Sequence, residues 1–250
     1  MSDKYQQILG VSFFTGSPAE AVDIGIAGGL VVVPAAPALV EMPDDPDYCE
    51  ALLQSDLAIT DSGFMVLVWR FTGGKALTRV SGLEYLKILL ERPQVRKPGA
   101  VLYIMPTKGS RDKCLAYLQS IGIKATEDDC YLAPMYPKGR INDPALIELI
   151  KRKRPDHIIL GLGGGTQERL GLHIKQGLDY KPGIHCIGAA IGFLSGDQVP
   201  IPAWADWLFL GWAFRIASKP SRFFPRYWKA RKLLPLMLKY KSRLPVAEVP

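Results

Sequence analysis

Short apolar runs alternate with amphipathic stretches along most of the chain, and this alternation allows few folds. The runs are short enough for buried strands and cover residues 30–33, 57–60, 100–105, 157–160 and, less clearly, 185–188. Helical spacing of apolar residues occupies residues 17–26, 82–91, 110–121, 144–153 and 167–177. Such alternation is typical of a parallel sheet whose faces are both covered. We therefore expect a Rossmann-like α/β fold with helices on both faces and ligand sites at the carboxyl ends of the strands.

The composition changes close to residue 204. Four of the five tryptophans and five further Phe or Tyr residues fall within residues 204–228. Prolines at positions 202, 220, 225 and 235 are expected to break this stretch into short helical pieces. We place a boundary near residues 200–202, which divides the chain into an α/β domain (residues 1–200) and a helical C-terminal appendage (residues 201–250).

The appendage carries charge of one sign. The formal net charge of the chain is +7, yet residues 207–247 contain no Asp or Glu. The basic residues there are Arg215, Lys219, Arg222, Arg226, Lys229, Arg231, Lys232, Lys239, Lys241 and Arg243. A block of this kind indicates an anionic partner, and Trp and Tyr suit a membrane interface. We expect docking on an anionic membrane surface rather than on nucleic acid, because no base-reading motif accompanies the charge.

The cysteines are widely spaced and indicate reduced thiols rather than a metal centre. No CxxC or Cys/His spacing typical of zinc occurs among Cys49, Cys114, Cys130 and Cys186, so we expect neither a metal nor a cofactor. The histidines have no metal-ligand spacing either, and we expect packing roles for His157 and His185. An apolar run of about 20 residues, as a membrane-spanning helix needs, is not found. The sequence predicts a cytoplasmic protein that contacts the membrane peripherally.

Residues 161–168, Gly-Leu-Gly-Gly-Gly-Thr-Gln-Glu, follow one predicted strand and open a predicted helix. Glycines allow a ligand to approach the backbone, and amides at a helix start favour phosphate. The candidate binding residues are Gly161, Gly163, Gly164, Thr166, Gln167 and Glu168. Thr166 stands where the dinucleotide fingerprint G-x-G-x-x-G has its third glycine, so that fingerprint is broken. The alternative is that the run only forms a tight strand-to-helix turn.

Two charged residues lie near another predicted strand end. Asp61 closes the run 57–60 and could act as a general base on an acceptor hydroxyl. Its alternative role is to cap the following helix. Arg79 precedes Gly82 at a predicted helix start, where it could bind a diphosphate through paired hydrogen bonds. The alternative for Arg79 is an ordinary surface arginine.

Read in order, these motifs resemble the WecG/TagA/CpsF family of bacterial glycosyltransferases. The family's Pro-Asp-Gly and Arg-Val-Thr-Gly-hydrophobic-Asp segments are similar to residues 60–63 and 79–84. Its Gly-Leu-Gly-x-Pro-x-Gln-Glu loop is similar to residues 161–168, and its later glycine–phenylalanine motif to residues 188–196. The closing Trp-, Arg- and Tyr-containing motifs resemble residues 201–204, 211–215, 220–222 and 226–227. The resemblance extends from about Leu9 to Tyr227 and rests on the shared order and spacing of these motifs.

The resemblance implies an inverting, metal-independent transfer of a sugar from a UDP-sugar donor. The implied acceptor is a sugar on a polyprenyl diphosphate at the cytoplasmic membrane face, and the product would feed a surface polysaccharide. Asp61 is implied as the base, with Gln167 and Glu168 on the nucleotide side. The appendage would meet the diphosphate through Arg215, Arg222 and Arg226. Family members can self-associate, so a homo-oligomer is also implied as an option.

The chain departs from the family pattern at several positions. The family's Thr-Pro-Asn after the first strand is Val-Pro-Ala at residues 33–35, which removes two polar groups of the expected acceptor pocket. Ser62 is an extra residue after Asp61, and Gly211 replaces a glutamate. A catalytically impaired membrane scaffold of a polysaccharide assembly complex is therefore the alternative function. A nucleotide-dependent oxidoreductase is a third reading, which the broken glycine fingerprint disfavours.

Overall fold

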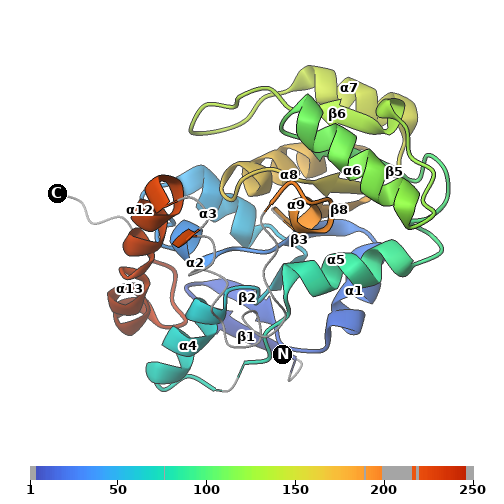
Figure 1. The fold of residues 1–250 in the computed structure, drawn as a ribbon. Coiled ribbons are helices and arrows are strands. Elements are labelled where there is room, and N and C mark those ends of the chain that lie inside the picture. The colour runs from blue at the N-terminus through green and yellow to red at the C-terminus, as the bar shows by residue number, and fades with distance from the viewer. Residues whose placement is uncertain (1–3, 76, 189, 199–215, 218–219, 246–250) are drawn as a thin grey trace.

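The centre of the molecule is a mostly parallel sheet. The structure, a computed structural model, describes residues 4–75, 77–188, 190–198, 216–217 and 220–245. Its eight strands follow the order β1-β2-β4-β3-β8-β7-β5-β6, and only β1 and β2 are antiparallel to each other (Figure 1). The strands are β1 Tyr5–Ile8, β2 Val11–Phe14, β3 Gly29–Val32, β4 Leu57–Ile59, β5 Val101–Met105, β6 Cys130–Leu132, β7 His157–Leu160 and β8 Gly183–Cys186. The predicted α/β class with a parallel sheet is confirmed.

Helices cover both faces of this sheet. One face packs against α1 (Pro18–Ile26), α5 (Gly82–Glu91), α6 (Lys108–Ser120) and α9 (Ala190–Leu194). The opposite face packs against α2 (Ala36–Leu39), α3 (Pro46–Leu53), α4 (Gly63–Phe71), α7 (Pro144–Lys153) and α8 (Thr166–Gly177). Successive strand residues point to opposite faces. Val31 therefore lies in the first core, under α1, α5, α6 and α9, and Leu30 and Val32 lie in the second core, under α2, α3, α4, α7 and α8. Because both faces are buried, the strands are continuous apolar runs in the sequence.

Two parts of the sheet do not follow from apolar runs. The strands β1 and β2 form a hairpin whose turn residues, Leu9 and Gly10, both have positive φ (51° and 80°). Positive φ at both turn positions matches the right-handed twist of the strands. The edge strand β6 contains only three half-buried residues, so it has no apolar run to reveal it. The hairpin and β6 extend the predicted sheet at its two edges.

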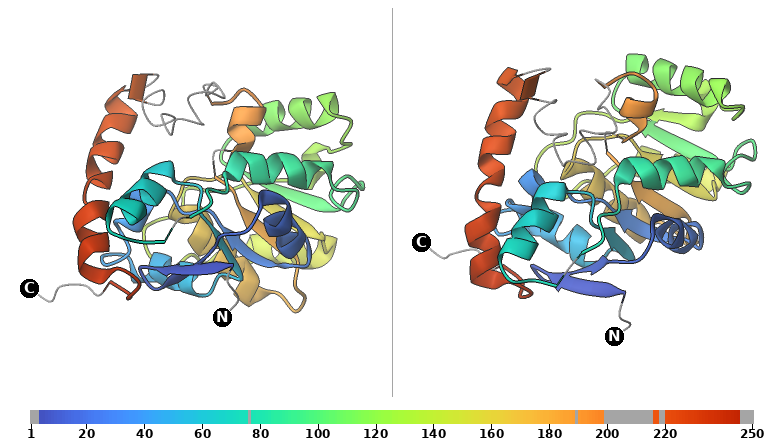
Figure 2. Two further views of the ribbon diagram at one scale, coloured as in Figure 1. Left: turned by 90° about the horizontal axis from the view of Figure 1, so that it is seen from below. Right: turned by 60° about the horizontal axis from the view of Figure 1, so that its bottom comes forward.

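The described part of the C-terminal appendage packs against the α/β domain. Its helices are α12 (Pro220–Ala230) and α13 (Leu233–Tyr240), which lie beside α2 and α4 (Figures 1 and 2). The chain after α13 is tied to the hairpin, since the Leu9 amide donates to the Lys241 carbonyl at 2.8 Å. Three appendage side chains are buried in the second core: Ala230, Leu233 and Met237. A helical C-terminal segment is therefore present, as predicted.

Several predictions fall on other parts of the chain. The boundary at residues 200–202, the tryptophans at 204, 207 and 212, and Arg215 lie outside the described residues. In the described part of the chain, no helix has both the length and the apolar character needed to cross a membrane.

Candidate functional site

The strand order places a topological switch point between β3 and β8. These two strands are neighbours, but the chain leaves β3 for α2 and α3 on one face and leaves β8 for α9 on the other. Ligands of open α/β sheets bind outside the carboxyl ends of strands at such a point. Asp61 follows β4, beside β3, and the glycine run 161–165 follows β7, beside β8. The strands β4 and β7 are three strand spacings apart, roughly 14 Å, with β3 and β8 between them. The two predicted motifs therefore flank the switch point.

Asp61 is held in place by the first residue of α5 and by Arg79. Its Oδ1 accepts a hydrogen bond from the Gly82 amide at 2.8 Å, and Gly82 is the first residue of α5. Its main-chain carbonyl accepts from Arg79 Nε at 2.8 Å. The Oδ2 atom forms no hydrogen bond with any residue that the structure describes. The carboxylate is thus oriented through one oxygen, while the other is the one that a substrate could reach.

The alternative that Asp61 caps the following helix is wrong. The following helix, α4, is capped by Ser62, whose Oγ accepts from the Met65 amide at 3.2 Å. Asp61 instead binds the first amide of α5, where Ser81 is the N-cap residue but its side chain forms no capping hydrogen bond. The extra residue Ser62 therefore releases Asp61 from the helix that follows it in the sequence.

Gly82 allows three elements to meet at this point. A Cβ atom at residue 82 would lie 3.0 Å from Val33 Cγ1 and 3.7 Å from Asp61 Oδ1. The start of α5, the end of β3 and the end of β4 are thus in close contact. Arg79 is brought to Asp61 by its hydrogen bond to the main chain, so the structure unites the predicted residues Asp61, Arg79 and Gly82.

The glycines of the 161–165 run have different tasks. A Cβ at Gly161 would meet Ile191 Cγ2 at 3.0 Å, so this glycine allows α9 to pack on the end of β7. Gly165 has φ 90°, a conformation that disfavours any side chain, and it is the N-cap of α8. Gly163 and Gly164 are exposed. The alternative of a tight strand-to-helix turn is therefore correct as geometry, and the turn leaves its middle open to a ligand.

The amides of this loop are only partly used. The Gly165 amide donates to Glu168 Oε2 at 2.6 Å, and the Gln167 amide donates to the Gly163 carbonyl at 3.1 Å. Within the described chain, the amides of Gly164 and Thr166 have no hydrogen-bond acceptor. Two N–H groups at a helix start are therefore available to an anion.

Gln167 and Glu168 point into the protein. Their side chains are 2% and 0% exposed. Gln167 Oε1 accepts from the Gly188 amide at 2.6 Å, and Gln167 Nε2 donates to Glu168 Oε1 at 3.0 Å. These bonds connect the end of β8 to the glycine loop after β7, the neighbouring strand on the same side of the switch point. The two residues belong to the site by position, but they shape it through other residues.

Arg169 is a residue of this site that its motif did not reveal. Its side chain is 7% exposed, and Arg169 Nε donates to the Gly165 carbonyl at 3.2 Å. Its Nη1 atom lies 3.4 Å from Asp45 Oδ2, at the start of α3. Arg169 therefore fixes the glycine loop from behind. The available sequence signal was its position directly after Gln167 and Glu168.

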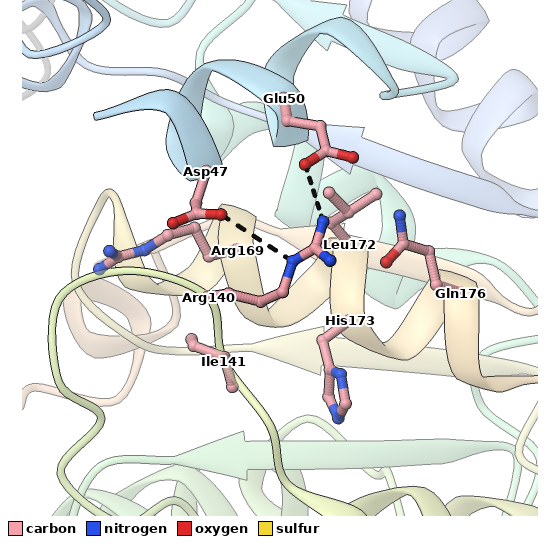
Figure 3. A pocket seen from close by; sticks show the side chains of 8 residues that line it. All are labelled: Asp47, Glu50, Arg140, Ile141, Arg169, Leu172, His173 and Gln176. Carbon is pink, nitrogen blue, oxygen red and sulfur yellow. Dashed lines mark hydrogen bonds and ion pairs between the residues drawn. The ribbon is translucent and has the colours of Figure 1, made fainter. Parts of the chain in front are cut away.

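A small pocket lies behind the loop and contains none of the predicted site residues. It is lined by Asp47, Glu50, Arg140, Ile141, Arg169, Leu172, His173 and Gln176 (Figure 3). Arg140 lies 3.1 Å from Glu50 and 3.9 Å from Asp47, and Arg169 faces Asp45. Because these cations are already paired with carboxylates, we assign no substrate to this pocket.

The appendage arginines are placed only in part. Residues 222 and 226 lie on α12, four positions apart, and residue 215 lies outside the described chain. Their contact with a diphosphate stays a prediction. The residues that the structure describes contain no group of three or more His, Cys, Asp or Glu side chains arranged to hold a metal ion.

The predicted packing role of two histidines matches their position. Tyr85 Oη lies 2.9 Å from His185 Nδ1, and His185 Nε2 lies 3.3 Å from His157 Nδ1. Both histidines are buried, at 0% and 2% exposure. Burial, together with the neighbouring His157, lowers the pKa of His185 to about 3, and burial also lowers the pKa of His157. The row extends from α5 into β8 and β7 and forms part of the interior.

Known proteins similar to this chain belong to one family. The model of the glycosyl transferase WecG/TagA/CpsF family matches residues 6–246. A protein of Bacillus subtilis (strain 168), named N-acetylglucosaminyldiphosphoundecaprenol N-acetyl-beta-D-mannosaminyltransferase, is 26% identical over 195 residues. That match covers 76% of this chain and 70% of the relative. The family match spans the sheet, the Asp61 and glycine motifs and the C-terminal helices, and the chain therefore belongs to the WecG/TagA/CpsF family of glycosyltransferases.

Proposed function

We propose that this glycosyltransferase moves a sugar from a UDP-sugar to a sugar carried on a polyprenyl diphosphate. The observation that supports this most is the pair of motifs that flank the switch point, a carboxylate on one side and a glycine-rich helix start on the other. The relative's name gives an acceptor of this lipid-linked class and an N-acetylmannosaminyl donor group. The acceptor class is carried over here, and the sugar is left to experiment.

Asp61 is the base in this proposal. Its Oδ2 atom accepts the proton of the acceptor hydroxyl while the hydroxyl oxygen attacks the anomeric carbon of the donor. The bond from that carbon to the UDP oxygen breaks on the opposite side, so the configuration at the anomeric carbon is inverted. The Gly82 amide on Oδ1 keeps the carboxylate in place without blocking Oδ2.

The departing UDP gains charge, which the glycine loop is suited to stabilise. We assign this to the amides of Gly164 and Thr166 at the start of α8, where the helix dipole also favours an anion. Gln167 and Glu168 act as positioning residues, because their hydrogen bonds hold the loop to the end of β8. Arg79 and the appendage arginines at 215, 222 and 226 are proposed to contact the diphosphates of donor and acceptor.

Membrane association follows from the proposed acceptor, which is anchored in lipid. Exposed basic side chains on the described appendage, such as Lys232, Lys241 and Arg243, supply attraction to anionic headgroups. We place the reaction at the cytoplasmic face of the membrane with the protein bound peripherally.

The test is a transfer assay with a panel of UDP-sugars and a polyprenyl-diphosphate-linked N-acetylglucosamine in vesicles. We expect one donor to give UDP and a lipid-linked disaccharide, with inverted anomeric configuration by NMR and equal rate in EDTA. If no donor releases UDP or forms a disaccharide, the transferase proposal fails. A rate that is lost in EDTA and restored by a divalent cation would contradict metal independence alone.

A membrane scaffold without catalysis is the second candidate. It is favoured by the apolar residues Val33 and Ala35 after β3, where family members have polar ones, and by the burial of Val33 against Gly82. A scaffold would bind vesicles but show no heat of binding with UDP or any UDP-sugar. Measurable UDP binding would rule out this alternative.

A further inference from the structure

Exposed apolar side chains are concentrated on two neighbouring elements. Ten large apolar residues are exposed in the described chain, and seven of them lie on α4 or on residues 220–245. On α4 they are Phe64 (38% exposed), Leu67 (48%) and Phe71 (80%). On residues 220–245 they are Phe224, Trp228, Leu238 and Leu244. The helices α4 and α13 pack against each other, so the two groups lie on adjacent elements (Figures 1 and 2).

The helix α4 is apolar on two sides. Met65, Val68 and Trp69 are buried in the core, which accounts for the position of the helix. Phe64, Leu67 and Phe71 follow the spacing i, i+3, i+7 and point away from that core. Folding of the described chain does not use this second stripe. An exposed apolar stripe of this kind marks an interaction surface.

The charge around the stripe selects the partner. No Asp or Glu occurs in residues 62–83, whereas Arg70 and Lys75 are exposed there. Next to α4, residues 233–245 expose Lys241 and Arg243 and contain no Asp or Glu. A surface that is apolar and basic fits the interface of an anionic bilayer, where apolar side chains enter the acyl boundary and cations meet headgroups.

We propose that α4 is a second membrane-docking helix, which inserts Phe64, Leu67 and Phe71 beside the C-terminal helices. Insertion of α4 would also fix the distance of Asp61 from the membrane surface, because the helix begins two residues after Asp61. At a rise of 1.5 Å per residue, Phe64 and Phe71 lie roughly 1.5 and 12 Å along α4 from its first residue, Gly63. The docking itself does not depend on the proposed transferase function, whereas the alignment of Asp61 with a lipid-linked acceptor rests on it.

The experiment compares the full-length wild type with Phe71→Ser and Leu67→Ser/Phe71→Ser in sedimentation with vesicles. The vesicles contain either phosphatidylcholine alone or phosphatidylcholine with phosphatidylglycerol. The matched control is Leu53→Ser, at an exposed apolar position (45%) at the end of α3. We expect partition into anionic vesicles to fall about tenfold for Phe71→Ser and further for the double variant, since each removes a side chain from the interface. Leu53→Ser should partition like the wild type.

Each other result has a defined meaning. Equal partition of the wild type and the double variant, with both folded by circular dichroism, would overturn the proposal. So would a change of oligomeric state in Phe71→Ser with unchanged partition, because the stripe would then bind a second copy. If no protein transfers sugar but the variants still lose vesicle binding, the docking inference stands and the transferase function fails.

Discussion

The Asp61 carboxylate is oriented by the amide of Gly82, a residue 21 positions away in the sequence. The sequence predicted Asp61 and Gly82 as members of one site, but it could not predict the bond between them. That bond depends on how the segment of residues 78–80 lies along β4, where Thr60 Oγ1 donates to the Thr78 carbonyl and accepts from the Val80 amide. The local pattern around Asp61 favoured a cap of the next helix, and Ser62 fills that role instead.

At the same scale, a substitution of the buried residue Gln167 can show whether this side chain positions the glycine loop or contacts UDP directly. Gln167→Ala leaves the Gly188 amide without its acceptor, so we expect the free energy of unfolding to fall by about 1–3 kcal/mol. We also expect weaker UDP binding, because the glycine loop loses its connection to β8. Calorimetry and chemical denaturation measure the two effects. The matched control is Gln176→Ala, an exposed position on the same helix, and a loss of UDP affinity with unchanged stability would instead indicate direct contact.

At the scale of elements, the turn from β7 into α8 contains the most constrained backbone of the site. Gly165 adopts φ 90° and ψ −54°, which L-residues with a side chain avoid. We expect Gly165→Ala to cost about 1–3 kcal/mol of stability and to raise the Kd for UDP. Gly109→Ala in α6 is the control, since Gly109 does not have positive φ and a Cβ there would meet nothing within 4 Å. If Gly165→Ala behaves like the control, the loop conformation is not needed for nucleotide binding.

Elements were predictable where burial was complete and harder where it was not. The strands β3, β4, β5 and β7 are buried along their whole length and therefore left clear apolar runs. The hairpin strand β1 has polar, partly exposed residues, and β6 is short and half-buried, so neither produced a run. The exposed stripe of α4 was also missed, because apolar residues surround that helix and give no single face.

At the scale of the whole molecule, buried histidines make stability depend on pH. Burial lowers the pKa of His185 to about 3, and the pKa of His157 is lowered too. Between about pH 6.5 and pH 3 the unfolded chain therefore binds more protons than the folded chain. The two histidines do not lower the free energy of unfolding above about pH 6.5. As the pH falls below that value, the free energy of unfolding decreases by up to about 1.4 kcal/mol per pH unit for each histidine that is neutral in the folded chain and protonated in the unfolded chain.

Chemical denaturation between pH 4 and pH 7 measures this dependence. We expect the slope of unfolding free energy against pH to be shallower in His185→Gln than in the wild type. His173→Gln is the control, because His173 is only partly buried and accepts a hydrogen bond from the Asp143 amide that glutamine can also accept. An unchanged slope in His185→Gln would show that other groups determine the acid sensitivity.

The α/β class and the position of both motifs at the carboxyl ends of strands could be inferred from the sequence, because buried parallel strands leave apolar runs. The order of the strands, which puts the two motifs on opposite sides of the switch point, could not be inferred. The arrangement of the appendage could not be inferred either, since its apolar and aromatic residues suit both a membrane interface and a protein interior. Ala230, Leu233 and Met237 are in fact buried against the α/β domain, while Phe224 and Trp228 remain exposed. The described appendage is thus both a packed part of the molecule and a candidate docking surface.

The central claim is that sugar transfer takes place at the carboxyl ends of the strands, between Asp61 and the glycine loop. The most direct measurement is the rate of disaccharide formation on the lipid-linked acceptor by wild type, Asp61→Asn and Asp44→Asn, an exposed carboxylate that serves as control. We expect Asp61→Asn to lose about 100-fold or more in rate, with UDP binding retained, and Asp44→Asn to match the wild type. Full activity in a folded Asp61→Asn variant would contradict the assignment of the base and of this edge as the site.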